Sequence, residues 1–166
     1  LIFLTNAGPE IGVASTKAFT TQLVSLALLT CVIGVMKKSV DRRQEAEIVN
    51  GLKRLPGLIS DTLLHENQIK KLAAQFIDKD SALFIGRGTM YAIAMEGALK
   101  LKEITYIHAE AFPAGELKHG PIALIDDSIP VIAIAPNDEL LSKLKSNLQE
   151  VKSRGSQMIV FEDKDS

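Results

Sequence analysis

The chain has few of the residues that nucleic-acid-binding and disulfide-stabilised proteins use. It has one cysteine, no tryptophan and 5% aromatic residues, and its formal net charge is −1. Without excess positive charge there is no electrostatic footprint for nucleic acid, and so few aromatic residues do not make a base-stacking platform. A single cysteine excludes an intrachain disulfide and fits a reducing compartment, so we expect a cytoplasmic protein.

Metal and cofactor chemistry is not expected either. The histidines and Cys31 do not have the spacing that metal ligands show. Cys31 lies in an apolar run and is expected to be a small core residue rather than a nucleophile. His65 lies in a polar helical stretch, and neither it nor His108 is assigned a chemical role. We therefore predict no metal and no cofactor.

Helical and strand-like segments alternate along the chain. Helices are expected at 15–36, 42–55, 66–77 and 138–153, with a further helical segment starting at Pro56, and strands at 1–5, 81–85, 130–135 and 156–161. Strands and helices that alternate with short links predict right-handed crossovers. The expected fold class is therefore α/β, a three-layer α/β/α sandwich with a mainly parallel sheet.

Two further features concern the N-terminal part and the ends. Residues 23–36 are markedly apolar but too short to span a bilayer, so we expect a buried core or interface helix and no membrane contact. The sequence opens on what looks like a strand already under way and ends just after another. We therefore expect a piece of a longer polypeptide.

A glycine turn, Gly86-Arg87-Gly88, joins the strand at 81–85 to the next helix. Free backbone N–H groups at such a helix start favour an anion, and Thr89 is a candidate N-cap. The motif is neither a full dinucleotide fingerprint nor a P-loop. An ordinary strand-to-helix turn is as good an interpretation.

The helix after this turn carries a charged face. Glu96, Lys100 and Glu103 stand at i, i+4 and i+7, so their side chains share one side. A carboxylate beside an ammonium group suits proton transfer on a small polar substrate, and His119, on a Gly/Pro-bounded turn, adds an imidazole. The alternative is a solvated ion pair, which contributes only about 0.3–0.5 kcal/mol.

Five segments together resemble the isomerase domains of the glutamine–fructose-6-phosphate aminotransferases, or glucosamine-6-phosphate synthases. These segments are 12–23, 86–88, 96–103, 108–110 and 116–121. The resemblance covers essentially the whole chain and implies the sugar isomerase (SIS) fold, which occurs twice in that domain. It implies that residues 1–40 are the C-terminal part of the first SIS subdomain, 41–78 connecting helices and 79–166 most of the second.

The family makes glucosamine 6-phosphate from fructose 6-phosphate and glutamine-derived ammonia. By resemblance, Glu103 is the base that moves a proton between C1 and C2 of the sugar, and Lys100 assists by stabilising developing negative charge. A glutamate suits that role because burial raises the pKa of a carboxyl group. His119 matches the histidine that helps to open the sugar ring from the partner subunit, which implies a homodimer.

The resemblance also assigns sugar contacts and a further partner. Val13 and Ser15 match positions that contact the sugar, although a packing role for Val13 is equally open. Glu96 has no role in the family and is expected to form an ion pair on the helix face. The glutaminase domain of the same parent polypeptide would supply the ammonia.

Two other functions stay open. A stand-alone phosphosugar isomerase would share the fold and the glutamate base but would transfer no nitrogen. A non-catalytic SIS module would bind a phosphosugar and regulate a partner, and such modules typically lack the acid/base groups. The polypeptide upstream discriminates between them, because an N-terminal cysteine indicates the glutaminase and a helix-turn-helix indicates the regulator.

The chain by itself is expected to have no synthase activity. The resemblance implies that the main phosphate-binding loop, the lysine that forms a Schiff base with the sugar and the glutaminase domain all lie outside it. A coupled assay for glucosamine 6-phosphate on the isolated chain should therefore give no product. Clear turnover in that assay would contradict this expectation.

Overall fold

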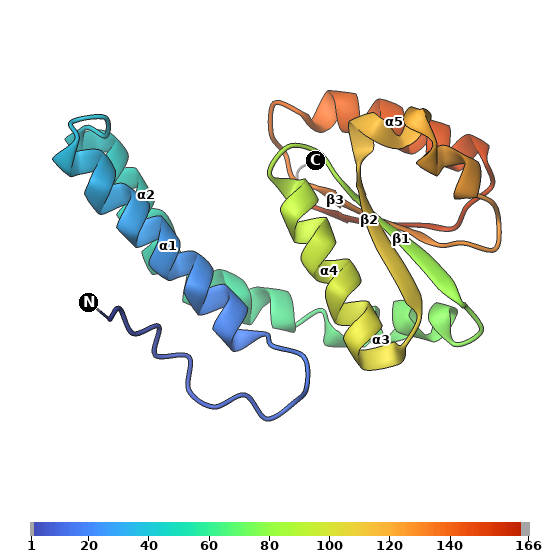
Figure 1. Cartoon of the computed structure of the whole chain (residues 1–166), viewed down its shortest axis with the longest axis horizontal. Coiled ribbons are helices and arrows are strands. Elements are labelled where there is room, and N and C mark those ends of the chain that lie inside the picture. The colour runs from blue at the N-terminus through green and yellow to red at the C-terminus, as the bar shows by residue number, and fades with distance from the viewer. Residues whose placement is uncertain (1, 164–166) are drawn as a thin grey trace. The chain divides into compact units, whose positions relative to one another are not determined.

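The computed structural model describes residues 2–163, which divide into two compact units with the boundary between Gln75 and Phe76 (Figure 1). The second unit starts at residue 76, and the expected assignment of residues 79–166 to a second SIS subdomain stays a prediction. The expected division of residues 1–78 into the tail of one subdomain and connecting helices stays a prediction.

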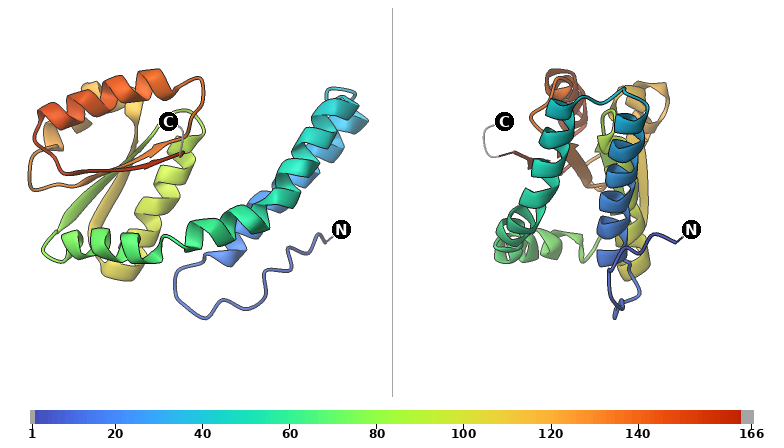
Figure 2. Two further views of the ribbon diagram at one scale, coloured as in Figure 1. Left: turned by 180° about the vertical axis from the view of Figure 1, so that it is seen from behind. Right: turned by 90° about the vertical axis from the view of Figure 1, so that its left-hand side faces the viewer.

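The first unit is built on two long helices, α1 (Lys17–Met36) and α2 (Arg42–Leu63), followed by the short α3 (Glu66–Ala73) and a 3₁₀ turn, Ala74–Phe76. Helices α1 and α2 lie side by side, as Figure 2 shows. The start of α2 is fixed by a capping box: the Asp41 carboxylate accepts from Gln44 N at 2.8 Å, and the Gln44 side chain accepts from Asp41 N at 2.9 Å.

Helix α2 corrects the expected break at Pro56. The helix continues from Arg42 to Leu63 with Pro56 inside it. A proline within a helix removes one backbone hydrogen bond and clashes with the carbonyl four residues earlier, so the sequence pattern favoured an interruption there. Here the neighbouring turns remain helical on both sides of the proline, and the Ser60 hydroxyl donates to the Pro56 carbonyl at 2.9 Å.

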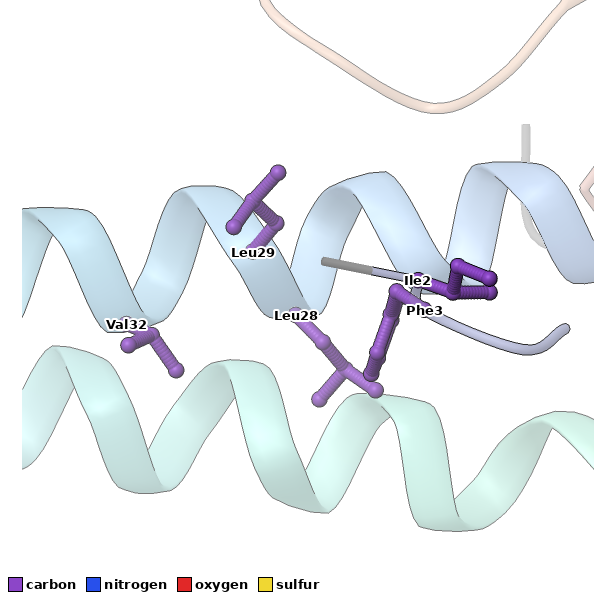
Figure 3. Close-up of a pocket in the computed structure, with 5 residues that line it drawn as sticks. All are labelled: Ile2, Phe3, Leu28, Leu29 and Val32. Atoms are coloured by element: carbon purple, nitrogen blue, oxygen red, sulfur yellow. The ribbon is translucent and has the colours of Figure 1, made fainter.

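The strand expected at residues 1–5 is wrong for its described residues, 2–5, which have no regular secondary structure. The described part of the first unit contains no strand with which they pair. Instead Phe3 lies next to Leu28 of α1, and Ile2 and Phe3 line an apolar pocket together with Leu28, Leu29 and Val32 (Figure 3). Ile2 and Phe3 remain 85% and 64% exposed, so the segment forms neither a sheet edge nor a packed core.

Helix α1 is apolar around most of its circumference and mostly exposed in this chain. Only Cys31 and Gly34 are buried, which agrees with a packing role for the cysteine. With 20 residues, α1 is longer than the apolar segment expected at 23–36, and by length and composition alone it is sufficient to cross a membrane. The apolar segment predicted at 23–36 is thus the C-terminal part of a longer apolar helix. A helix apolar on all sides is typical of the interior of a larger protein or of a membrane.

The second unit confirms the predicted α/β class. Its sheet contains β1 (Ser81–Gly86), β2 (His108–Pro113), β3 (Val131–Ala135) and β4 (Met158–Glu162), all parallel, in the order β2-β1-β3-β4. Helix α4 (Met90–Thr105) connects β1 to β2, and α5 (Leu141–Ser153) connects β3 to β4. Because the two crossovers move in opposite directions from the centre of the sheet, their helices cover opposite faces.

Strand β2 was not predicted from the sequence, which placed the second strand of this unit at 130–135. Its His108 and Glu110 side chains are exposed and Ala109 is fully buried. Such alternation fits an edge strand, but alanines give a weak strand signal. Helix α5 also begins at Leu141 rather than at 138, whereas its end before Gly155 (φ +82°) is as predicted.

Each face of the sheet has its own core. Leu83 and Ile85 of β1 pack with α5 and with the 3₁₀ helix η2 (Ala114–His119). Phe84, which points the other way, lies against Gly97 of α4. Figure 2 shows the sheet between the two helices, and this confirms the three-layer arrangement.

We predict that Gly97→Ala destabilises the second unit by about 1–3 kcal/mol, because the added methyl group overpacks a close helix–strand contact. A Cβ at Gly97 would stand 2.8 Å from Phe84 Cε1. Tyr91 and Tyr106 both lie in the second unit, so tyrosine fluorescence during urea unfolding reports on it.

Gly57→Ala in α2 is the matched control, since a Cβ there meets no atom within 4 Å. Gly57→Ala should leave the urea midpoint that tyrosine fluorescence reports unchanged. An unchanged transition for Gly97→Ala would show that α4 is not held closely on β1.

Candidate functional site

The structure brings together the three charged residues predicted on α4. Lys100 Nζ lies 2.7 Å from Glu103 Oε2 and 3.4 Å from Glu96 Oε1. The ion pair predicted for Glu96 is therefore present. One ammonium group is shared by two carboxylates, and the pair with Glu103 is the shorter.

This cluster is half-buried. The side chains of Lys100, Glu96 and Glu103 are 21%, 22% and 32% exposed, so none is sealed in the core and none projects fully into solvent. The hydrogen bond to Glu103 raises the pKa of the Lys100 ammonium above its ordinary value of 10.5. Partial desolvation opposes this pKa rise and the contact with Glu96 adds to it. The ammonium is thus held in its charged form.

The cluster lies toward the C-terminal end of α4, which ends where Tyr106 adopts a left-handed conformation (φ +61°). Because α4 returns the chain between two parallel strands, its C-terminal end is close to the amino ends of the strands (Figure 1). A carboxylate and a fixed positive charge within hydrogen-bonding distance can accept a proton and stabilise a developing negative charge.

The glycine turn lies at the opposite, carboxyl ends of the strands. Gly88 has φ +58°, and a Cβ at Gly86 would collide with the Met90 carbonyl, so this geometry requires both glycines. Thr89 occupies the N-cap position but its side chain makes no capping hydrogen bond, because its own backbone is already helical. The Arg87 guanidinium donates to Asn147 Oδ1 of α5 at 3.0 Å. The turn is therefore a packed connection between β1 and α4.

His119 also lies at the carboxyl side of the sheet, at the end of η2, which follows β2. Its Nδ1 is 2.6 Å from Glu116 Oε2, and its side chain is 73% exposed. The strand β2, six residues long, separates the end of α4 from η2, a span of roughly 17 Å at 3.3 Å per residue. Within one chain, therefore, His119 is not brought to the Lys100–Glu103 pair.

Val13 and Ser15 belong to the irregular segment before α1 in the first unit; Val13 is 92% exposed and Ser15 is half-buried.

Glu10, which was not predicted from the sequence, joins this irregular segment to the start of α1. The Glu10 carboxylate accepts from Ala18 N at 2.8 Å and from Thr16 N at 3.1 Å. The hydrogen bond from Ala18 lowers the pKa of Glu10. An acid six residues before the N-cap is not a usual capping pattern, so no sequence signal indicated it.

A pocket of about 360 Å³ lies beside α4 and β2. It is lined by Ala92, Met95, Glu96, Ala98, Leu99, Lys102 and Ala111. It includes Glu96 but neither Lys100 nor Glu103, so it lies beside the charged cluster rather than around it. Among residues 2–163, no group of three or more His, Cys, Asp or Glu side chains is arranged to hold a metal ion.

Comparison with known proteins gives consistent matches. The SIS domain family matches residues 75–166. A glutamine–fructose-6-phosphate aminotransferase [isomerizing] of Pseudomonas putida is 60% identical over 98% of this chain, and that of Escherichia coli K12 is 58% identical over 100% of it. The chain spans 27% of the length of each of these curated relatives.

Solved structures agree. The C-terminal domain of a glucosamine-fructose-6-phosphate aminotransferase from Francisella tularensis is 55% identical and superposes with a TM-score of 0.96, over 98% of this chain and 46% of that one. A glucosamine-6-phosphate deaminase from Thermotoga maritima, 23% identical, has a TM-score of 0.64 over 93% of this chain and 44% of that one, and shows a shared fold alone.

The cluster predicts how stability changes at alkaline pH. Because the pKa of Lys100 is raised in the folded chain, its contribution is complete below 10.5 and is lost as pH rises through the folded-state pKa. The stability difference between the parent chain and Lys100→Met, from urea unfolding, should be constant from about pH 8 to pH 9.5 and shrink above pH 10.5. A difference independent of pH throughout would contradict the pairing.

Proposed function

The chain belongs to the SIS domain family, and from this we propose that it is part of the isomerase domain of a glutamine–fructose-6-phosphate aminotransferase. The substrates would be fructose 6-phosphate and glutamine-derived ammonia, and the product glucosamine 6-phosphate. One observation carries the proposal: identity of 55–60% extends over at least 98% of the chain to proteins that bear this name.

The charged cluster on α4 suits the isomerisation step. In the proposed reaction, Glu103 removes a proton from one of the adjacent sugar carbons, C1 or C2, and returns it to the other. Lys100, 2.7 Å away, stabilises negative charge on the neighbouring sugar oxygen while the proton is on the glutamate. No electron leaves the sugar, so the step needs no redox partner.

His119 would act on the substrate of a second subunit. Ring opening transfers a proton from the anomeric hydroxyl to the ring oxygen as the bond between the anomeric carbon and that oxygen breaks, and an imidazole suits this exchange. The separation of His119 from Glu103 along β2 supports a site shared between two copies, because one copy does not bring the two groups together. We therefore propose a homodimer.

Further partners are expected because the relatives are much longer than this chain. The chain spans 27% of them, and the glutaminase domain would be another part of the same polypeptide. On this proposal, further parts of the isomerase domain cover the apolar surface of α1, and the sugar would contact Val13 and Ser15. We propose a cytoplasmic location for the whole protein.

The two alternative functions are less well supported. A stand-alone phosphosugar isomerase or a regulatory SIS module would share the fold, which distant structures such as the deaminase also share. Neither explains identity near 60% along the whole chain, including the first unit.

Replacing Glu103 tests the proposal. In the longer polypeptide that contains this chain, Glu103→Gln should lower the conversion of fructose 6-phosphate by about 10²–10⁴-fold, because the amide cannot take up the proton. Binding of fructose 6-phosphate, measured by calorimetry, should persist.

Glu96→Gln is the matched control on the same helix face, since it also removes one carboxylate partner of Lys100. Its effect should be less than about tenfold. Equal turnover of Glu103→Gln and the parent enzyme would show that the base is another residue.

A further inference from the structure

The 3₁₀ helix η2 holds a carboxylate directly against the imidazole of His119. A 3₁₀ helix has three residues per turn, so side chains at i and i+3 lie one above the other. Glu116 and His119 stand at these positions, and Glu116 Oε2 lies 2.6 Å from His119 Nδ1. An ionised carboxylate only accepts hydrogen bonds, so the imidazole donates its Nδ1–H in this contact.

The other residues of η2 anchor it to the unit. Ala114 and Leu117 are fully buried in the core between the sheet and α5. Lys118 Nζ lies 2.8 Å from Glu150 Oε1 on α5. Gly115 packs against the guanidinium of Arg87. The Glu116 and His119 side chains are 60% and 73% exposed and pair with each other. Lys118 is also exposed, but its ammonium is held on Glu150.

The helix also ends directly after the histidine. Gly120 has φ +139°, a conformation that L side chains rarely adopt, and the chain then enters a second 3₁₀ turn, Pro121–Leu124. The backbone before His119 is therefore held by packing, and the backbone after it turns at Gly120. The rotation and tautomer of its ring depend on side-chain contacts, and Glu116 supplies the contact to Nδ1 within the described chain.

We propose that Glu116 is a positioning residue for His119. By holding the proton on Nδ1, it leaves Nε2 as the outward nitrogen with a free lone pair, ready to exchange a proton with a sugar hydroxyl. This inference rests on the proposed function, which assigns His119 to ring opening. Glu116 itself touches no substrate; it acts through the histidine.

An exposed ion pair usually contributes little to stability, so the test measures catalysis and tautomer state. In the full-length enzyme, Glu116→Ala should lower kcat for fructose 6-phosphate by about tenfold, a part of the 10²–10⁴-fold typical of a general acid or base, with KM changed less than about twofold. Glu116→Gln should recover most of the rate, because its amide oxygen still accepts from Nδ1–H.

A double variant shows whether Glu116 acts through the histidine. Glu116→Ala should cause no further loss when it is added to His119→Ala. The matched control is Glu66→Ala, which removes a similarly exposed carboxylate that lies 2.7 Å from Lys70 Nζ and has no assigned role. Its kcat should equal that of the parent enzyme.

A spectroscopic measurement does not depend on turnover. With [15N]histidine-labelled enzyme at mildly alkaline pH, the His119 ring, assigned by its absence in His119→Ala, should show a protonated Nδ1 and an unprotonated Nε2. In Glu116→Ala the ring should change to a mixture of both tautomers, and in Glu116→Gln it should keep the parent pattern.

The outcomes separate the two proposals. An unchanged tautomer and an unchanged kcat in Glu116→Ala, together with a large loss in Glu103→Gln, would overturn the role of Glu116 and leave the proposed function intact. A loss that is equally large with and without His119 would also overturn it. Full turnover in Glu103→Gln would instead overturn the proposed function.

Discussion

The second unit depends on the close packing of α4 against β1. Gly97 faces the Phe84 ring, Gly86 faces the Met90 carbonyl, and Ala94 and Ala98 are buried on the helix face toward the sheet. Small residues at these contacts let α4 approach β1 closely. This close packing fixes the distance of α4 from the sheet and its rotation about its own axis. That rotation leaves Lys100 and Glu103 half-buried beside the packed face, where they remain accessible while solvent is partly excluded.

The same packing sets a limit on what one chain does. A helix that connects two parallel strands runs antiparallel to them. The C-terminal end of α4 therefore lies near the amino ends of the strands, and the end of β2 lies at their carboxyl ends. The Lys100–Glu103 pair is near the amino ends of the strands, and His119 is near their carboxyl ends. A site that uses all three groups, as proposed above, would therefore draw His119 from a second copy of the chain. The topology of the second unit thus supports the proposed shared site in addition to the resemblance.

Sequence reasoning predicted the parallel α/β class, three of the four strands of the second unit and the Glu96–Lys100–Glu103 face, because these depend on local periodicity. It missed β2, whose alanines become a strand only through pairing with β1. It predicted an interruption of α2 at Pro56, because the lost hydrogen bond of a proline can be read from the sequence. The stabilisation that the helical turns on both sides provide cannot be read in the same way. It proposed His119 as a candidate residue but did not predict its contact with Glu116, which depends on the 3₁₀ geometry of η2.

In the first unit, composition alone does not distinguish a helix that spans a membrane from one that is buried inside a larger protein. Helix α1 satisfies the length and hydropathy of a membrane span, and its side chains are mostly exposed in this chain. Burial in a larger fold leads to the same composition, since a helix covered on all sides by protein needs no polar face. The chain spans 27% of relatives that it matches from end to end at close to 60% identity. On the proposed function, further parts of the isomerase domain would cover α1, and its exposed leucines lie on the surface where they would pack.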